Sequence, residues 1–307
     1  MKKLEVTFKN TRDTTGYLFS LTKCLSAALS YGGYAEYAQD IIASSGFAFR
    51  MWAASDLCPS AMSIWEFQKQ KPWVENGGLC CDYVERMWGQ DEIEEERRLK
   101  GIEIIKESID NGIAAVAWDI SGCEWGLVTG YNDDTQTLYT LKIDGNDAEV
   151  SYSELGKLEL PILSVLTVTG KTDKSPERIV RDTKKLALSH LRGKEWCDNA
   201  KGLEAYDSLI TFVNEKLTVD ILWNLEYYLG TYAALKWYAW QFFDKYGETE
   251  LSEIYQKVYD CWQSAFDTLK EQGEHILNAE SYKVISDALS KAKSLEEKAM
   301  GFFEKAE

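Results

Sequence analysis

The spacing of hydrophobic and polar residues along the chain predicts helices and strands in its first part. Residues 21–31 place apolar side chains three and four positions apart, which predicts a helix that ends at Gly32-Gly33. A second helix is predicted from about Asp91 to Ile109. Apolar runs of strand length follow with short connections, so we expect an antiparallel meander. These runs span residues 113–120, 124–131, 137–143 and 160–168.

The stretches between and before these elements are less regular. Alternating or aromatic runs predict short strands, while helical spacing between proline and glycine residues predicts short helices. The expected elements are strands at residues 4–8 and 46–52 and helices at 34–44, 61–70 and 79–88.

Beyond residue 172 the pattern is helical throughout. Ser175-Pro176 restarts it, because serine caps a helix and proline is tolerated at the first helical position. The predicted helices span residues 176–192, 200–215, 219–246, 249–272 and 279–304. We therefore predict an α+β protein, with an α+β domain at residues 1–172 and an all-helical domain at residues 173–307.

Composition and charge narrow the classes of function. The 307 residues are 45% hydrophobic and 27% charged, which is typical of folded domains with substantial cores. The net charge of -16 repels polyanions, so we expect no nucleic-acid partner and no binding to anionic membranes. The chain start lacks the apolar stretch of a signal peptide, and no run reaches transmembrane length. We therefore expect a cytoplasmic protein.

The cysteines show no metal-binding or disulfide pattern. There are seven, an odd number, and none of them forms a C-x-x-C pair. We therefore predict no metal site and no cofactor, and expect most of the thiols to be reduced and buried. Cys24 is the exception that could carry chemistry, because it lies near the start of the first predicted helix. A helix N-terminus stabilises a thiolate, although a buried structural cysteine is the alternative.

The arrangement around Cys24 resembles a known family. A helix opening with this cysteine is followed by Ser45-Gly-Phe-Ala-Phe-Arg50, then by a strand reading Gly112-Ile-Ala-Ala-Val-Ala-Trp118 and another reading Glu124-Trp-Gly-Leu-Val-Thr-Gly-Tyr-Asn-Asp133. This pattern is similar to the papain-like fold of bacteriocin-processing cysteine peptidases. It resembles more closely the N-terminal domain of the butirosin-biosynthesis acyltransferase H family, in which a helical domain often follows.

The resemblance implies a set of site residues. Cys24 would be the nucleophile, Glu124 or Trp125 would stand at the position of the general base, and Asp144 would orient that base. The family's base is histidine, and this chain has Glu124 there instead. An oxyanion-hole glutamine before Cys24 is also not evident, since residues 19–23 offer only Ser20 and Thr22 as uncharged polar side chains.

The two histidines and one arginine are further candidates for a functional role. His190 and His275 lie near predicted helix ends, where we expect capping or surface roles. Arg50 follows the aromatic run and could bind a substrate carboxylate or phosphate, or form an internal salt bridge.

These residues support two hypotheses about one predicted cleft between the domains, where Cys24, Arg50, Glu124 and Trp125 would meet aromatic residues of the second half. The first is acyl transfer or amide hydrolysis through a Cys24 thioester on a small or peptide-like substrate, with a carrier protein as the partner that the resemblance implies. The second is a non-catalytic protein that binds a small molecule or peptide on the same scaffold. A structural role through a homodimer, formed by the aromatic helix, is a third.

Overall fold

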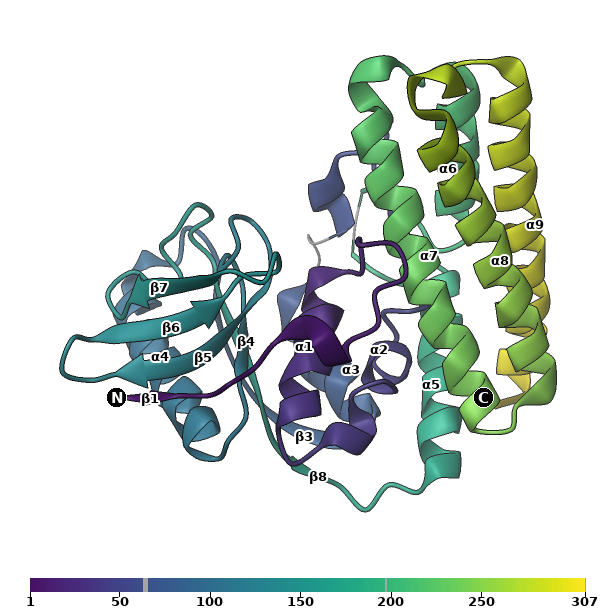
Figure 1. Cartoon of the computed structure of the whole chain (residues 1–307). Coiled ribbons are helices and arrows are strands. Elements are labelled where there is room, and N and C mark those ends of the chain that lie inside the picture. Colours follow the sequence, from purple (N-terminus) through teal and green to yellow (C-terminus); the bar gives the residue numbers. More distant parts are fainter. Residues whose placement is uncertain (63–65, 197, 307) are drawn as a thin grey trace. The chain divides into compact units, whose positions relative to one another are not determined.

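The computed structural model describes residues 1–62, 66–196 and 198–306, and the chain falls into two compact units (Figure 1). The sheet unit comprises Met1–Arg12, Ser20–Ile41 and Glu66–Lys174. The helical unit comprises Asp13–Phe19, Ile42–Trp65 and Ser175–Glu307. The fold is therefore α+β, with an antiparallel sheet in one unit and a helical C-terminal part in the other.

Seven strands of the described residues form one antiparallel sheet in the sheet unit. Its order is β3-β8-β4-β5-β6-β7, and β1 pairs with β5 outside this path. The strands are β1 (Lys2–Lys3), β3 (Leu79–Arg86), β4 (Ala115–Ala117), β5 (Gly126–Asn132), β6 (Thr137–Leu141), β7 (Asp147–Ser151) and β8 (Leu163–Lys171). The predicted meander is present as β4, β5 and β6, and β8 returns to lie between β3 and β4.

Helices pack on this sheet through alternating apolar residues. The helix α4 (Glu94–Asp110) buries Ile105 and Ile109 against Val128 and Val165, which lie on one face of the sheet. The helix α1 (Ser20–Tyr31) packs against β4 and β5, and α3 (Gln70–Asn76) packs against β3. The short helix α2 (Ile41–Ser44) follows α1 in the chain. The sheet thus holds the start of α1 beside the start of β5.

The helical unit contains five long helices and a two-stranded sheet in the part of the chain that is described. The helices are α5 (Pro176–Leu191), α6 (Glu204–Glu215), α7 (Leu222–Lys245), α8 (Thr249–Gln272) and α9 (Ala279–Phe303). The strands β2 (Trp52–Ala53) and β9 (Ala200–Lys201) pair antiparallel. The predicted cap is confirmed at α5, where the Ser175 side chain accepts the Arg178 N–H and proline occupies the first turn.

A segment from the first half of the chain supplies part of the core of the helical unit. The Phe49 ring contacts those of Phe243, Tyr255 and Phe303. The Ala48 carbonyl accepts a hydrogen bond from Lys236 Nζ, which is fully buried. Residues 42–62 therefore fold with the helices that follow residue 175, whereas the sequence predicts them in the first domain.

Several sequence predictions of secondary structure are wrong. The strand expected at residues 4–8 is absent, because β1 covers only Lys2–Lys3 and a 3-10 helix spans Phe8–Asn10. The helix expected at 34–44 is present only as the short helices Ala35–Tyr37 and Ile41–Ser44. Part of the helix expected at 61–70 lies outside the described residues, and Phe67–Lys69 form a 3-10 helix. Residues 79–86 form strand β3 rather than a helix, and both α3 and α4 pack against this strand. Residues 46–51 form turns before β2 rather than a strand, because Gly46 has a left-handed φ of 84° and the aromatic side chains are buried on all sides by the helical unit. The long helices were predicted to within a few residues, and α8 has the predicted bounds.

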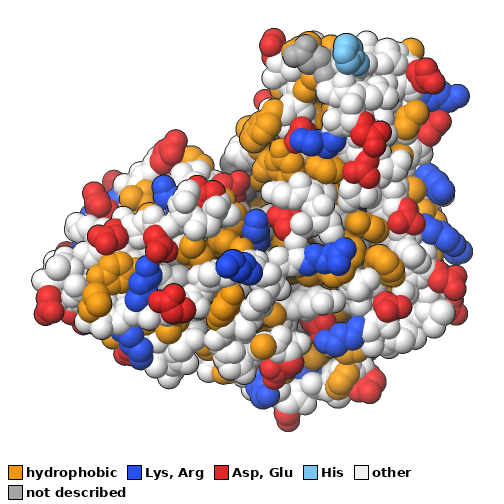
Figure 2. Space-filling model, in the orientation of Figure 1, with side chains coloured by type: hydrophobic (Ala, Val, Ile, Leu, Met, Phe, Trp, Pro, Cys, Tyr) orange, Lys and Arg blue, Asp and Glu red, His pale blue; other side chains and the backbone are white. Residues whose placement is uncertain are grey.

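No helix among the described residues is long and apolar enough to cross a membrane. On the face shown in Figure 2, acidic and basic side chains are interspersed rather than segregated by sign.

Candidate functional site

The start of α1 meets Glu124 within the sheet unit. Ser20 is the first residue of α1, and its hydroxyl donates a hydrogen bond to Glu124 Oε2. Glu124 lies just before β5, the strand against which α1 packs, and its side chain is half-buried. Ser20 is 4% exposed. The first helix therefore meets Glu124 through Ser20, whereas the sequence predicts Cys24 at this place.

Cys24 lies one helical turn after Ser20 and is fully buried. Burial raises the pKa of the Cys24 thiol, Lys23 opposes this, and the negative charge of Glu124 raises the pKa further. The thiol is therefore protonated near neutral pH. Of the two alternatives for Cys24, a helix-stabilised thiolate and a buried cysteine, the structure shows the buried one, because the cost of burying a charge outweighs the helix dipole here.

The loop between β4 and β5 positions Glu124, and Asp119 holds this loop. Asp119 is buried, and its two carboxylate oxygens accept the backbone N–H groups of Cys123 and Leu160, each at 2.7 Å. Asp119 and Cys123 both have left-handed φ angles, 62° and 56°. Aspartate tolerates this conformation better than most residues because its side chain bonds to the local backbone. The loop conformation therefore depends on Asp119.

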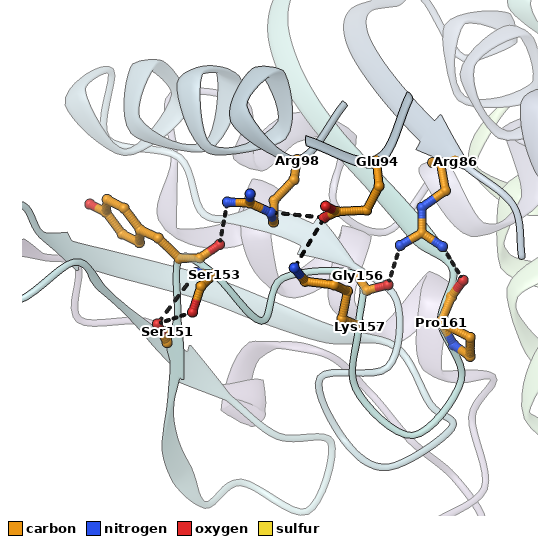
Figure 3. A network of polar contacts seen from close by, with 9 residues as sticks. Arg86, Glu94, Arg98, Ser151, Ser153, Gly156, Lys157 and Pro161 are labelled. Atoms are coloured by element: carbon orange, nitrogen blue, oxygen red, sulfur yellow. Dashed lines mark hydrogen bonds and ion pairs between the residues drawn. The ribbon is translucent and has the colours of Figure 1, made fainter. Parts of the chain in front are cut away.

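A buried arginine fixes the segment that carries Leu160. Arg86 on β3 donates to the carbonyls of Gly156, at 2.8 Å, and Pro161, at 2.5 Å (Figure 3). Beside it, Glu94 accepts from Arg98 at 2.8 Å and lies 3.5 Å from Lys157. These contacts tie the segment 156–161 to β3 and α4. Because Leu160 bonds to Asp119, they support the loop that positions Glu124.

Asp144 lies in the turn after β6, where it is exposed. Its carboxylate accepts the backbone N–H of Asn146 at 2.9 Å and the Asn146 side-chain amide at 3.0 Å. These bonds lower the pKa of Asp144, with the backbone bond as the larger cause. Asp144 therefore stabilises its own turn, whereas the resemblance implies that it orients the base. The Ile143 N–H donates to the Ser121 hydroxyl at 2.6 Å. This bond links the turn after β6 to the loop that carries Glu124.

Trp125 is a core residue of the sheet unit. It is fully buried, and its ring lies 5.4 Å from that of Phe67 and 5.1 Å from that of Trp118. These are normal distances between packed aromatic rings. Trp125 therefore anchors the chain in the core directly after Glu124, which differs from the ligand-binding role predicted from the sequence.

Arg50 belongs to the helical unit and takes part in an internal ion pair. Its Nε lies 2.8 Å from Glu195 Oε2, its Nη1 donates to the Met62 carbonyl at 2.8 Å, and its guanidinium stacks on Trp52. His190 Nδ1 lies 2.5 Å from the other Glu195 oxygen, and His190 is buried. Of the two roles weighed for Arg50, the structure shows the salt bridge. The predicted surface role of His190 is wrong, because Glu195 holds its ring inside.

One group of side chains in the described part of the chain has the spacing of a cation site. Asp119, Cys123 and Glu159 place one ligand atom each within 4.8 Å of the others. Burial raises the pKa of the Cys123 thiol, and the charges of Glu159 and Asp119 raise it further. Cysteine binds metals as a thiolate. The raised pKa favours the protonated thiol instead. We assign no metal to it.

Comparison with protein-family models finds no match to this chain, and comparison with curated proteins finds none either. The site is therefore defined by its geometry.

Sequence reasoning found Glu124 but missed Ser20 and Asp119. The available signal for Ser20 was its spacing of four residues from Cys24, which places both side chains on one helix face. Asp119 had no such signal, because its partners are backbone N–H groups and one of them, that of Leu160, lies in a distant segment.

Proposed function

We propose that the sheet unit carries out acyl transfer or amide hydrolysis at the junction of α1 and Glu124. The observation that carries this proposal is the hydrogen bond from the first residue of α1 to the Glu124 carboxylate. A positioned hydroxyl or thiol beside a base is the arrangement that nucleophilic catalysis requires. Glu124 is the base in this proposal, because it replaces the histidine of the families that the sequence resembles.

The start of α1 contributes a second element of this chemistry. The first N–H groups of a helix have no partner within the helix, and they carry partial positive charge. Such groups stabilise the oxyanion that forms when a nucleophile attacks a carbonyl. The same helix turn therefore presents both a nucleophile and donors for the developing charge.

The substrate class follows from the reaction and from the resemblance. We propose a small or peptide-like acyl donor, with a carrier protein as the macromolecule that delivers or receives the acyl group. The papain-like identity of the sheet unit belongs to this proposal. It is supported by a cysteine-containing helix packed on an antiparallel sheet at the strand that begins beside Glu124.

The proposal is tested with p-nitrophenyl acetate, an activated acyl donor whose cleavage releases a coloured product. The intact protein should release p-nitrophenolate faster than buffer does. Glu124→Gln should lower this rate by about 10²-fold or more, the usual contribution of a general base. Glu154→Gln, an exposed glutamate on the segment after β7, is the matched control and should leave the rate unchanged. Equal rates for the intact protein and Glu124→Gln would refute the proposal.

A non-catalytic binding protein on the same scaffold is the second candidate. The observation that favours it is the complete burial of Cys24, the residue that the resemblance makes the nucleophile. A protein of this kind would give no turnover of the acyl donor above buffer in the experiment above.

A further inference from the structure

We propose that the Ser20 hydroxyl, and not the Cys24 thiol, is the nucleophile of this site, so that the acylated intermediate is an oxygen ester. This inference rests on the proposed function, because it names the reacting atom of the same reaction. It reverses the assignment that the sequence suggested. The family resemblance points to a cysteine, whereas the geometry of this chain points to the serine one turn earlier.

Ser20 and Cys24 differ in how they interact with the Glu124 carboxylate. Ser20 Oγ donates its proton directly to Glu124 Oε2, so donor and base are already paired. Cys24 lies on the same face of α1 one turn deeper, and it is 0% exposed. Glu124 acts on Cys24 through its charge, and that charge opposes loss of the thiol proton.

The chemistry of oxygen and sulfur then decides between them. A cysteine attacks as a thiolate, so it requires a negative charge before the reaction begins. A buried position near the Glu124 carboxylate disfavours that charge. A serine stays neutral until the moment of attack, because its base removes the proton as the new bond forms. The arrangement therefore suits a hydroxyl and hinders a thiol.

The reaction balances with these groups alone. Ser20 Oγ attacks the acyl carbon while its proton passes to Glu124, and the bond from the acyl carbon to the leaving oxygen or nitrogen breaks as Glu124 returns the proton to the leaving group. In the second half, a water molecule or an acceptor hydroxyl or amine attacks the ester. Its proton passes to Glu124 and then to Ser20 Oγ, which is restored.

Neighbouring contacts hold the pair in place. Glu124 is carried by the loop that Asp119 fixes, and it is followed by the buried Trp125. The Thr11 hydroxyl donates to the Ser26 hydroxyl at 3.1 Å, and this bond ties the segment before α1 to the helix that carries Ser20. Asp119 thus acts on the base through the loop that carries it.

The test locates the acyl group. The intact protein is mixed with p-nitrophenyl acetate and quenched in acid, and the acetylated peptide is identified by mass spectrometry. We expect the acetyl group on Ser20, and we expect the adduct to survive neutral hydroxylamine, which cleaves thioesters. Ser20→Ala should lower p-nitrophenolate release by about 10²-fold or more. Cys24→Ala should keep both the adduct and the rate within a few-fold of the unsubstituted protein.

Two further variants guard against a folding artefact. Ser30→Ala removes another hydroxyl of α1, one that bonds to the Ser26 carbonyl, and should leave the rate unchanged. Ser20→Cys should move the acetyl group to a sulfur at the same position, and its adduct should become sensitive to neutral hydroxylamine. A structural role of Ser20 would not produce this change in chemical sensitivity.

The outcomes separate this inference from the function on which it rests. An acetyl group on Cys24, or full turnover by Ser20→Ala, would overturn the serine assignment while leaving a Glu124-dependent reaction standing. Turnover that is insensitive to Glu124→Gln would overturn both. So would the absence of both adduct and turnover in the intact protein.

Discussion

At the scale of single residues, the helical unit contains a group of buried charges that its sequence did not reveal. Arg50 and His190 each bond to one oxygen of Glu195, and all three side chains are almost completely buried. Burial alone would raise the pKa of Glu195, but Arg50 and His190 outweigh it and lower the pKa to about 2. Glu195 lies 145 residues from Arg50 in the chain, so only folding brings them together.

This group predicts a loss of stability in acid. Because the pKa of Glu195 is lowered in the folded state, its contribution is present above about pH 4.5 and is lost as the pH falls toward about 2. The shift corresponds to about 3 kcal/mol. Urea unfolding should show that Glu195→Gln loses about this much at pH 7 and depends less on pH between 5 and 3. The exposed Glu297→Gln is the control. Parallel pH profiles for Glu195→Gln and the unsubstituted protein would contradict the prediction.

At the scale of elements, the strand that follows Glu124 begins at a crowded glycine. A Cβ on Gly126 would lie 2.6 Å from Ile120 Cγ2 and 3.1 Å from the Leu141 carbonyl oxygen. Gly126 pairs with Ala117 at the edge of the loop that holds Glu124. The close approach of three chain segments at this point requires a residue without a side chain.

We therefore expect Gly126→Ala to destabilise the protein by about 1–3 kcal/mol, the usual cost of overpacking. It should also lower p-nitrophenyl acetate turnover more than stability alone explains, since Glu124 lies two residues away. Gly33→Ala is the matched control, because a Cβ at Gly33 meets nothing within 4 Å. Its loss should be at most about 0.5 kcal/mol. Urea unfolding followed by tryptophan fluorescence measures both, and equal losses for the two variants would show that Gly126 is not crowded.

At the scale of the whole molecule, the two units are not two consecutive stretches of chain. The helical unit takes Asp13–Phe19 and Ile42–Trp65 from the first half, on either side of α1 in the sequence. Residues 42–62 contribute Trp52 to the helical unit in addition to Ala48 and Phe49. The backbone N–H of Trp52 donates to the Tyr232 hydroxyl, and this hydroxyl donates to the backbone carbonyl of Trp52. A boundary near residue 172 therefore separates the helices from part of their own core.

This arrangement predicts the behaviour of a fragment. Residues 173–307 expressed alone should lack a sharp thermal transition, because the Lys236–Glu296 pair and the rings around Phe49 would face a void. Adding a synthetic peptide of residues 42–62 should restore a cooperative transition, measured by near-ultraviolet circular dichroism. A peptide with Phe49→Ala and Trp52→Ala is the control and should not. A fragment that melts sharply without the peptide would refute this account.

The order of residues along the chain is enough to predict which segments are long helices, where the helical half begins and that a meander follows the second long helix. These features depend on local periodicity and on caps such as Ser175, which are written in neighbouring residues. Glu124 was also found from sequence, through the resemblance that the segment 124–133 carries. Tertiary structure decided what lies opposite it. Ser20, Asp119 and the Arg50–Glu195 pair take their roles from groups far away in the chain, and burial, which local sequence does not fix, set the protonation of Cys24.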